Sequence, residues 1–253
     1  MSIKFTILGS GSSLGIPRID GNFGRCNPKN QKNYRMRCSA LISDNRNSIL
    51  IDTSPDIKSQ LLKNKVKNID RVFYTHSHAD QTHGINELRV FYLKNKKKIN
   101  IYADNSTKRY LLKSFGYCFK NIRDYPSILK MNNLKKFHQI KNIRIKPIKV
   151  KHGLISSYCY MINNICGYAP DVSKIYDKDL KYFYNLKYLV VDCLRYDWHP
   201  SHFNLKSVLN LVEKIKPKKT ILTNINSDID HEEVKKHLPK NIVPGYDGMN
   251  FKL

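Results

Sequence analysis

A short segment rich in histidine constrains this chain more than any other feature. The apolar run RVFY (residues 71–74) is typical of a buried strand, and THSHADQTHG (residues 75–84) follows it at once. In an extended segment, His76 and His78 point to the same side and can share one cation, and Asp80 lies two residues further on. Imidazole and carboxylate together suit zinc, manganese and iron. The segment predicts a metal site at a strand end; the alternative is a polar loop in which histidine is frequent by chance.

Strands and helices alternate along the rest of the sequence without a linker. The apolar patterns predict strands at residues 3–8, 38–43, 48–52, 71–74, 99–103, 143–150, 157–162, 165–169, 188–191 and 220–222, and two more that close the chain. They predict helices at about residues 56–63, 85–93, 205–215 and 231–237, a further helix capped by Ser106, and a hairpin turn at residues 163–164. We expect a single α/β domain over residues 1–253.

The pattern H-x-H-x-D after an apolar strand resembles the metallo-β-lactamase superfamily. Further segments resemble its phosphodiesterase branch in the same order, and we list them with their first residues: ILGSGSS (7), GIP (15), LIDTSPD (50), KHG (151), APDVS (169), VD (191), PSHF (200) and YDGM (246). The chain is most similar to the PhnP-like phosphoribosyl cyclic phosphodiesterases. The resemblance implies an α/β metallo-β-lactamase fold, a four-layer αββα sandwich of two mixed β-sheets flanked by helices.

The resemblance also implies a set of metal ligands. His152, just after the predicted strand at residues 143–150, matches the histidine that joins His76 and His78 at the first metal, and Asp171 matches the carboxylate that bridges both metals. Asp80 matches a ligand of the second metal. A packed histidine at a strand end is the alternative for His152.

Catalytic roles follow from the same resemblance. His202 aligns with the histidine that cyclic phosphodiesterases use beside the metals, where it would protonate the leaving oxygen, and His199 is its rival. Asp80 is expected to be catalytic as well as a ligand, and Ser201 to contact the substrate. Asp52, at the end of a predicted strand, is expected to orient a ligand histidine.

The loop from Gly9 to Arg37 contains five glycines and four arginines. Glycines let backbone amides approach an anion, and arginines bind phosphate through paired hydrogen bonds, so Arg18 and Arg35 are expected to bind substrate. The loop holds no Walker motif, and its glycines could equally serve only to permit turns.

Two positions depart from the family pattern, and both concern the second metal. The family places histidines where this chain has Gln81 and Asn224. Amide oxygens are weak, neutral ligands that suit hard cations better than zinc. We therefore expect a weak second site and one divalent ion per chain, zinc or manganese.

The charge is strongly positive, because 45 Lys and Arg outnumber 20 Asp and Glu to give +25 at pH 7. Such a field attracts anions and favours a nucleic-acid or polyphosphate partner. The alternative is genome composition, since the abundant Lys, Asn and Ile all have codons rich in A and T. No run approaches the roughly 18 apolar residues of a membrane helix, and we expect no signal peptide because the chain runs straight into the predicted strand at residues 3–8. Six scattered cysteines without a C-x-x-C pair are typical of reduced thiols, so we expect a cytoplasmic protein with no membrane partner.

Three hypotheses of function remain at this point. The first is a metal-dependent phosphodiesterase that acts on a small cyclic or nucleotide-like phosphodiester through hydroxide at the metal. The second is a ribonuclease Z-like nuclease, which the charge favours. The third is a catalytically impaired relative that binds nucleotide or nucleic acid. A homodimer is compatible with each of them.

Overall fold

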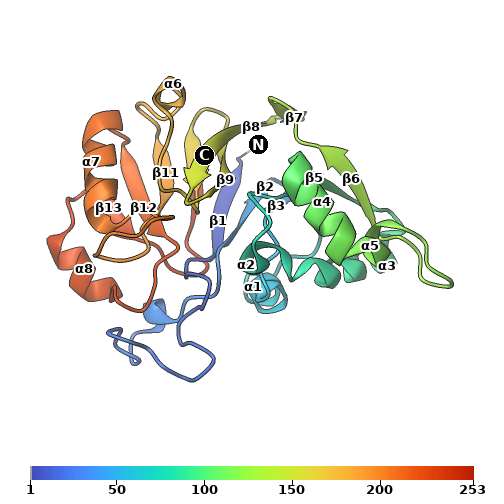
Figure 1. Cartoon of the computed structure of the whole chain (residues 1–253), viewed down its shortest axis with the longest axis horizontal. Helices are drawn as coiled ribbons and strands as arrows, with labels where there is room; N and C mark the ends of the chain where they lie inside the picture. Colours follow the sequence, from blue (N-terminus) through green and yellow to red (C-terminus); the bar gives the residue numbers. More distant parts are fainter. Residues whose placement is uncertain (1) are drawn as a thin grey trace. The chain divides into compact units, whose positions relative to one another are not determined.

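Each of two compact units of the chain is built on one seven-stranded β-sheet (Figure 1). The computed structural model describes residues 2–253. Unit 1 comprises residues 2–8, 39–134 and 250–253, and unit 2 comprises residues 9–38 and 135–249. Both sheets mix parallel and antiparallel strands, and each has helices beside it. The predicted α/β class with two mixed sheets and flanking helices is confirmed, while the single domain over residues 1–253 stays a prediction.

The sheet of unit 1 has the strand order β14-β1-β2-β3-β4-β5-β6. Its strands are β1 (Lys4–Gly9), β2 (Ser39–Ser43), β3 (Ser48–Ile51), β4 (Arg71–Phe73), β5 (Ile99–Ala103), β6 (Leu129–Asn133) and β14 (Asn250–Lys252). Strands β3 to β6 are parallel, so their carboxyl ends share one edge of the sheet. That edge is where the histidine-rich segment follows β4.

The helices of unit 1 bury their apolar sides against this sheet. They are α1 (Ile57–Lys63), α2 (Ala79–Thr82), the 3-10 helix η2 (Ile85–Leu88), α3 (Arg89–Asn95), α4 (Asn105–Ser114) and α5 (Gly116–Phe119). Ile57, Leu88 and Leu111 from the helices share one core cluster with strand residues such as Val72 and Ile101. This packing fixes the strand ends that carry the histidines.

The sheet of unit 2 has the order β13-β12-β11-β10-β9-β8-β7. Its strands are β7 (His138–Ile140), β8 (Ile143–His152), β9 (Ile155–Ile162), β10 (Cys166–Ala169), β11 (Tyr188–Asp192), β12 (Lys219–Thr223) and β13 (Ile242–Pro244). Strands β10 to β13 are parallel, whereas β7 to β10 pair antiparallel. The parallel strands again bring their carboxyl ends to one edge, where Asp171, Asp192 and Asn224 follow or end them.

Unit 2 also holds η1 (Gln31–Asn33), α6 (Asp177–Leu180), α7 (Leu205–Ile215) and α8 (His231–His237). Helix α7 begins where the Asn204 side chain accepts a hydrogen bond from the Ser207 amide, and it ends at Lys216 in the left-handed conformation. Its buried side chains, Val208, Leu211, Val212 and Ile215, belong to the core cluster of this unit.

The predicted elements agree with the structure in most places. Residues 99–103, 205–215 and 231–237 have the predicted bounds, and Asn163 and Asn164 both adopt the positive φ of a tight turn. The helix predicted at residues 85–93 is present as the 3-10 helix η2 followed directly by α3. One prediction is wrong: the cap of α4 is Asp104, whose side chain accepts from the Thr107 amide, and not Ser106. Strands β6 and β7 were missed because both are short and rich in polar residues.

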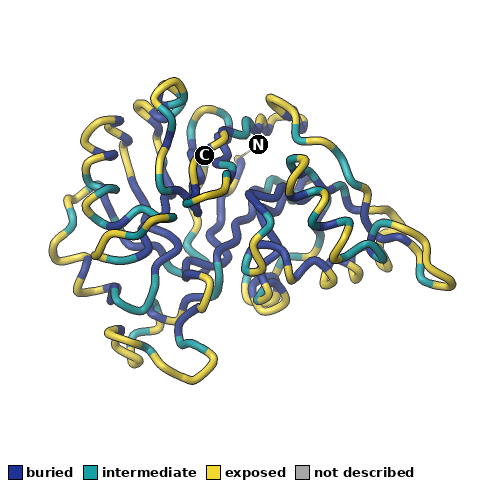
Figure 2. The backbone as a smooth tube through the Cα atoms, viewed as in Figure 1, coloured by how far each residue is buried: buried dark blue, intermediate teal, exposed yellow. Residues whose placement is uncertain are grey.

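Buried backbone follows the strands of each unit, and exposed backbone follows the loop tips (Figure 2). None of the helices described for residues 2–253 combines the length and the apolar character that a membrane span requires.

Candidate metal centre

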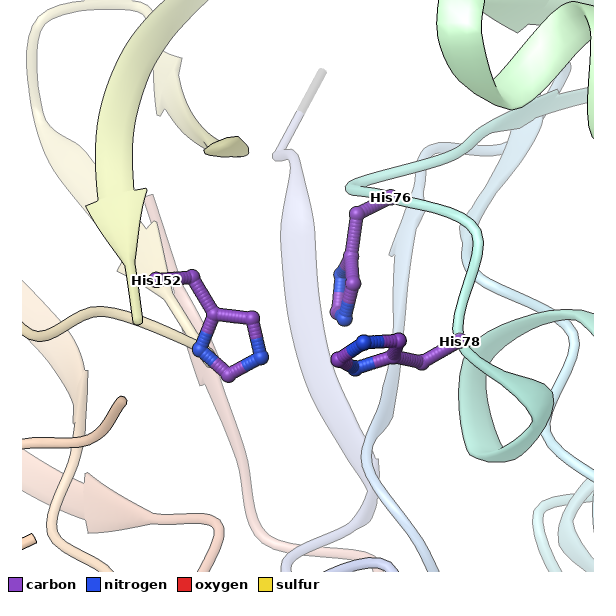
Figure 3. Close-up of side chains that lie close together, drawn as sticks. All are labelled: His76, His78 and His152. Atoms are coloured by element: carbon purple, nitrogen blue, oxygen red, sulfur yellow. The ribbon is translucent and has the colours of Figure 1, made fainter. Parts of the chain in front are cut away.

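In unit 1, the imidazoles of His76 and His78 lie together at the end of β4. Their ring centroids are 4.4 Å apart and the rings meet edge to face (Figure 3). His76 is buried, whereas His78 is exposed and precedes the first turn of α2 in an extended conformation. The backbone bends at Thr75 and is extended at His78, and the rings of His76 and His78 lie together, as their spacing predicts.

A hydrogen-bonded chain fixes the ring of His76. The fully buried Asp52 accepts from the Thr75 amide and from the Thr75 hydroxyl, each at 2.8 Å. The Thr75 Oγ1 lies 3.0 Å from His76 Nδ1. Because the hydroxyl hydrogen goes to Asp52, Oγ1 accepts from an Nδ1–H of His76, which leaves the lone pair for a metal on Nε2. Burial raises the pKa of the Asp52 carboxyl well above its usual range, and the hydrogen bonds from Thr75 oppose that shift.

Asp80 and Gln81, in the first turn of α2, contact each other through their side chains. The Gln81 side chain donates from Nε2 to Asp80 Oδ2 at 3.2 Å, and the Gln81 carbonyl accepts from the Thr53 amide at 2.8 Å. His83 turns away from this group, because its Nε2 lies 2.9 Å from the Tyr110 hydroxyl.

In unit 2, His152 ends β8 and is buried (Figure 3). Its Nδ1 lies 2.7 Å from the carbonyl oxygen of Ser201. A carbonyl only accepts, so Nδ1 carries the hydrogen and Nε2 has the lone pair that a ligand needs. Gly153 lets the chain at residue 153 pass close to Ser201. Its φ is +60°, and a side chain there would place its Cβ only 2.8 Å from the Ser201 Cβ, which is too close.

Two carboxylates and a histidine complete the group in unit 2. One ligand atom from each of His152, Asp171 and His202 lies within 4.8 Å of the others. His202 Nδ1 lies 2.7 Å from Oδ2 of Asp192, which is fully buried at the end of β11. Burial raises the pKa of Asp192, and its contact with His202 opposes that shift. Asp192 thus holds His202 as the carboxylate of a catalytic dyad would.

His199, the rival of His202, has a different environment. Its Nδ1 faces the Ser201 hydroxyl at 3.1 Å, and its ring centroid lies 5.1 Å from that of His202. Burial and the nearby His202 and Arg195 lower the pKa of His199. Only His202 of this pair bonds to Asp192 in the part of the chain that the structure describes.

Asn224 follows β12 and is also buried. Its φ is +58°, the left-handed conformation that asparagine tolerates better than most residues. Its Nδ2 donates to the Pro170 carbonyl at 2.8 Å and to Asp171 Oδ1 at 3.1 Å, and lies 3.2 Å from His202 Nδ1.

Comparison with known proteins identifies the family. Residues 47–225 match the family model of the β-lactamase superfamily domain. The chain belongs to the metallo-β-lactamase superfamily. A solved diphosphatase from the PhnP family is 30% identical, with a TM-score of 0.92, over 100% of this chain and 98% of its own. The predicted family, its PhnP-like branch and the fold class are confirmed.

Two further relatives extend the comparison. The Zn²⁺-bound PqqB from Methylobacterium extorquens has the same fold, with 15% identity and a TM-score of 0.82 over 99% of this chain and 100% of its own. An octanoyltransferase from Porphyromonas gingivalis is 27% identical over 98% of this chain. The chain spans about half the length of this curated relative, 51%.

The donor chemistry in each unit fits the divalent metals that this superfamily binds. His76 in unit 1 and His152 in unit 2 are each held through Nδ1 by an oxygen, the arrangement that orients a ligand imidazole. Thr75 contacts Nδ1 of His76 and Asp192 contacts Nδ1 of His202, but no role was assigned to either residue from the sequence, although the segment VD (191) was among those that resemble the family. The signal for Asp192 was its place at the end of an apolar strand, the same place that pointed to Asp52.

The two arginines expected to bind substrate have different surroundings. Arg35 is 1% exposed, and its guanidinium donates to the Ile229 carbonyl at 2.8 Å and to Asn33 Oδ1 at 3.3 Å. Burial lowers its pKa. This placement favours a role in fixing the loop of residues 9–38 within unit 2. Arg18 is more exposed and pairs with Asp20 at 3.0 Å.

Proposed function

We propose that this superfamily member is a metal-dependent hydrolase that cleaves a small cyclic or nucleotide-like phosphodiester. The observation that carries the proposal is the Asp192–His202 hydrogen bond of 2.7 Å beside His152 and Asp171 in unit 2. The 30% identity to a diphosphatase of the PhnP family supports phosphoryl chemistry.

The metal ligands in this proposal are His76, His78, His152 and Asp171, as the family pattern implies, with one zinc or manganese ion per chain. The ion would supply positive charge that polarises a phosphoryl oxygen and acidifies water. Thr75 and the Ser201 carbonyl contribute by fixing Nδ1 of the two buried histidines.

His202 is the proposed general acid. Its Nδ1–H donates to Asp192, so the second proton of the imidazolium sits on Nε2 and can pass to the leaving oxygen. Asp192 fixes the ring and stabilises the imidazolium. Asp80, held by Gln81, is the second proposed catalytic residue and would accept a proton from the attacking water. Ser201, Arg18 and Arg35 are the residues expected from the sequence to contact the substrate. We propose Ser201 and Arg18 for this role, because Arg35 is buried and is the least accessible of the three.

Leaving-group dependence tests the general acid. His202→Ala should slow hydrolysis of an alkyl phosphodiester by about 10²- to 10⁴-fold, because an alkoxide needs a proton as it departs. The loss should be far smaller with a p-nitrophenyl ester, whose leaving group departs without one. His199→Ala is the matched control and should lack this dependence. Equal losses of His202→Ala on both substrates would contradict the role, and absence of turnover by the metal-loaded wild type on every diester would contradict the function.

A nuclease is the second candidate, because the net charge of +25 favours a nucleic-acid partner. The logarithm of the binding constant for duplex DNA should then fall linearly with the logarithm of the salt concentration, with a slope of about −0.9 for each neutralised phosphate. A flat response would leave genome composition as the explanation of the charge. Competition of tRNA against a small cyclic phosphodiester separates the two substrate classes, and binding without turnover would identify the impaired relative.

A cytoplasmic location and a homodimer belong to the same proposal. All six cysteines are free, buried thiols, which suits a reducing compartment.

A further inference from the structure

Asn224 presents hydrogen-bond donors at a position where the family pattern has a metal-binding histidine. Its Nδ2 has two hydrogens, and the two closest acceptors are the Pro170 carbonyl at 2.8 Å and Asp171 Oδ1 at 3.1 Å. A backbone carbonyl can only accept, so it fixes which end of the amide is nitrogen. The end of Asn224 that faces Asp171 is therefore the N–H end, which repels a cation.

Gln81 in unit 1 shows the same polarity. Its Nε2 donates to Oδ2 of Asp80 at 3.2 Å. Each of the two amides that stand in place of a histidine thus donates to a carboxylate that the family pattern assigns to the metals. The residues present do not fit a second ion held through Asn224, because its oxygen end is turned away from Asp171.

Negative charge explains why a donor is useful at this position. Asp171 Oδ1 and Asp192 Oδ2 both face His202 Nδ1, at 4.0 Å and 2.7 Å, and both carboxylates are buried. Two buried carboxylates need hydrogen-bond donors or a cation nearby. The amide hydrogens of Asn224 supply part of that compensation to Asp171 without any ion.

We infer that Asn224 is a positioning residue whose amide takes the place of a second metal ion. It holds Asp171 by a hydrogen bond from Nδ2, and the metal centre therefore binds one ion. This inference rests on the proposed function in one respect only, that Asp171 belongs to a metal centre. Changing the polarity of residue 224 should change the number of ions bound.

The test compares wild type with Asn224→Asp and Asn224→Ala in the full chain, with Mn²⁺ as the probe. Metal-free N224D should melt lower than wild type by roughly 5 °C or more, because the donor becomes another buried carboxylate. Excess Mn²⁺ should raise the bound metal of N224D from one to two ions per chain by native mass spectrometry. N224A should lose stability in the metal-free state and should gain no ion.

Asn33 offers a matched control within unit 2. It is buried, and its Nδ2 also donates to one carbonyl, of Asn27 at 3.1 Å, and to one carboxylate, of Asp230 at 2.6 Å. The Arg35 guanidinium lies 3.3 Å from Asn33 Oδ1 and already supplies positive charge there. N33D should therefore gain no Mn²⁺, which separates the effect of residue 224 from the general effect of a new buried carboxylate.

Two results would overturn the inference. One is two tightly bound ions in the wild type, and the other is an N224D protein with wild-type stability and one ion. If the wild type binds no metal at all, the proposed function fails instead, and the melting temperatures of the metal-free variants still decide whether Asn224 holds Asp171.

Discussion

Removal of one hydroxyl group should weaken the metal centre without touching a ligand. Thr75→Val keeps the shape of the side chain and the backbone N–H that donates to Asp52, but it deletes the hydroxyl that lies 2.8 Å from Asp52 Oδ2 and 3.0 Å from His76 Nδ1. Asp52 is fully buried, so no water replaces the lost donor. His76 loses the acceptor that fixes its ring.

The size of the effect follows from these contacts. A buried acceptor that loses its partner costs about 1–3 kcal/mol. At roughly 2–4 °C per kcal/mol for a chain of this size, the metal-free protein should melt about 2–12 °C lower. Loss of an oxygen that orients a ligand histidine typically costs about 10- to 100-fold in metal affinity. The free energy of unfolding and the dissociation constant for Zn²⁺ should therefore both change.

Thr53→Val is the control for this measurement. Thr53 is as buried as Thr75, and its hydroxyl contacts the Tyr74 hydroxyl at 2.7 Å and the Thr82 carbonyl at 3.1 Å. Its loss should lower the melting temperature to a similar extent and leave the affinity for Zn²⁺ unchanged. The reasoning is refuted if Thr75→Val binds Zn²⁺ within twofold of wild type, measured with a competing chelator.

Three further outcomes are expected. His78→Ala should abolish metal uptake because one of three proposed imidazole ligands is lost. Full metal occupancy of this variant by elemental analysis would contradict the role of His78 as a ligand. The double change Gln81→His with Asn224→His should raise the metal content from one to two ions per chain and increase turnover, since two amides become imidazoles; two fully occupied transition metals in the wild type would contradict this. Burial and the nearby Lys32 and Arg35 lower the pKa of His231 to about 4. The unfolded chain, with a histidine pKa of about 6.5, binds the proton first, so stability should fall by up to about 3 kcal/mol as pH drops from 6.5 to 4. His231→Leu should flatten the pH profile of urea unfolding in that window, and an unchanged profile would exclude His231 as the source.

Local chemistry was predictable from the sequence wherever it depends on neighbouring residues. The two-residue spacing of His76 and His78 in an extended segment places both rings on one side, and the helix of residues 205–215 follows from its apolar period and its cap at Asn204. The prediction of the N-cap of α4 was wrong because Asp104 and Ser106 are both residue types that favour this position. The backbone becomes helical at residue 105, which makes Asp104 the cap.

Orientation of the polar side chains was decided by the tertiary structure. Whether His199 or His202 bonds to Asp192 depends on the loop between β11 and α7, and the polarity of Asn224 depends on a carbonyl 54 residues away. Arg35 looked like a phosphate ligand in a glycine-rich loop, yet the Ile229 carbonyl, 194 residues away, holds it in the interior. A sequence shows which donors and acceptors exist and which stand at strand ends. Only the fold brings each donor to its acceptor, because those partners are distant in the chain and a buried polar group must find one.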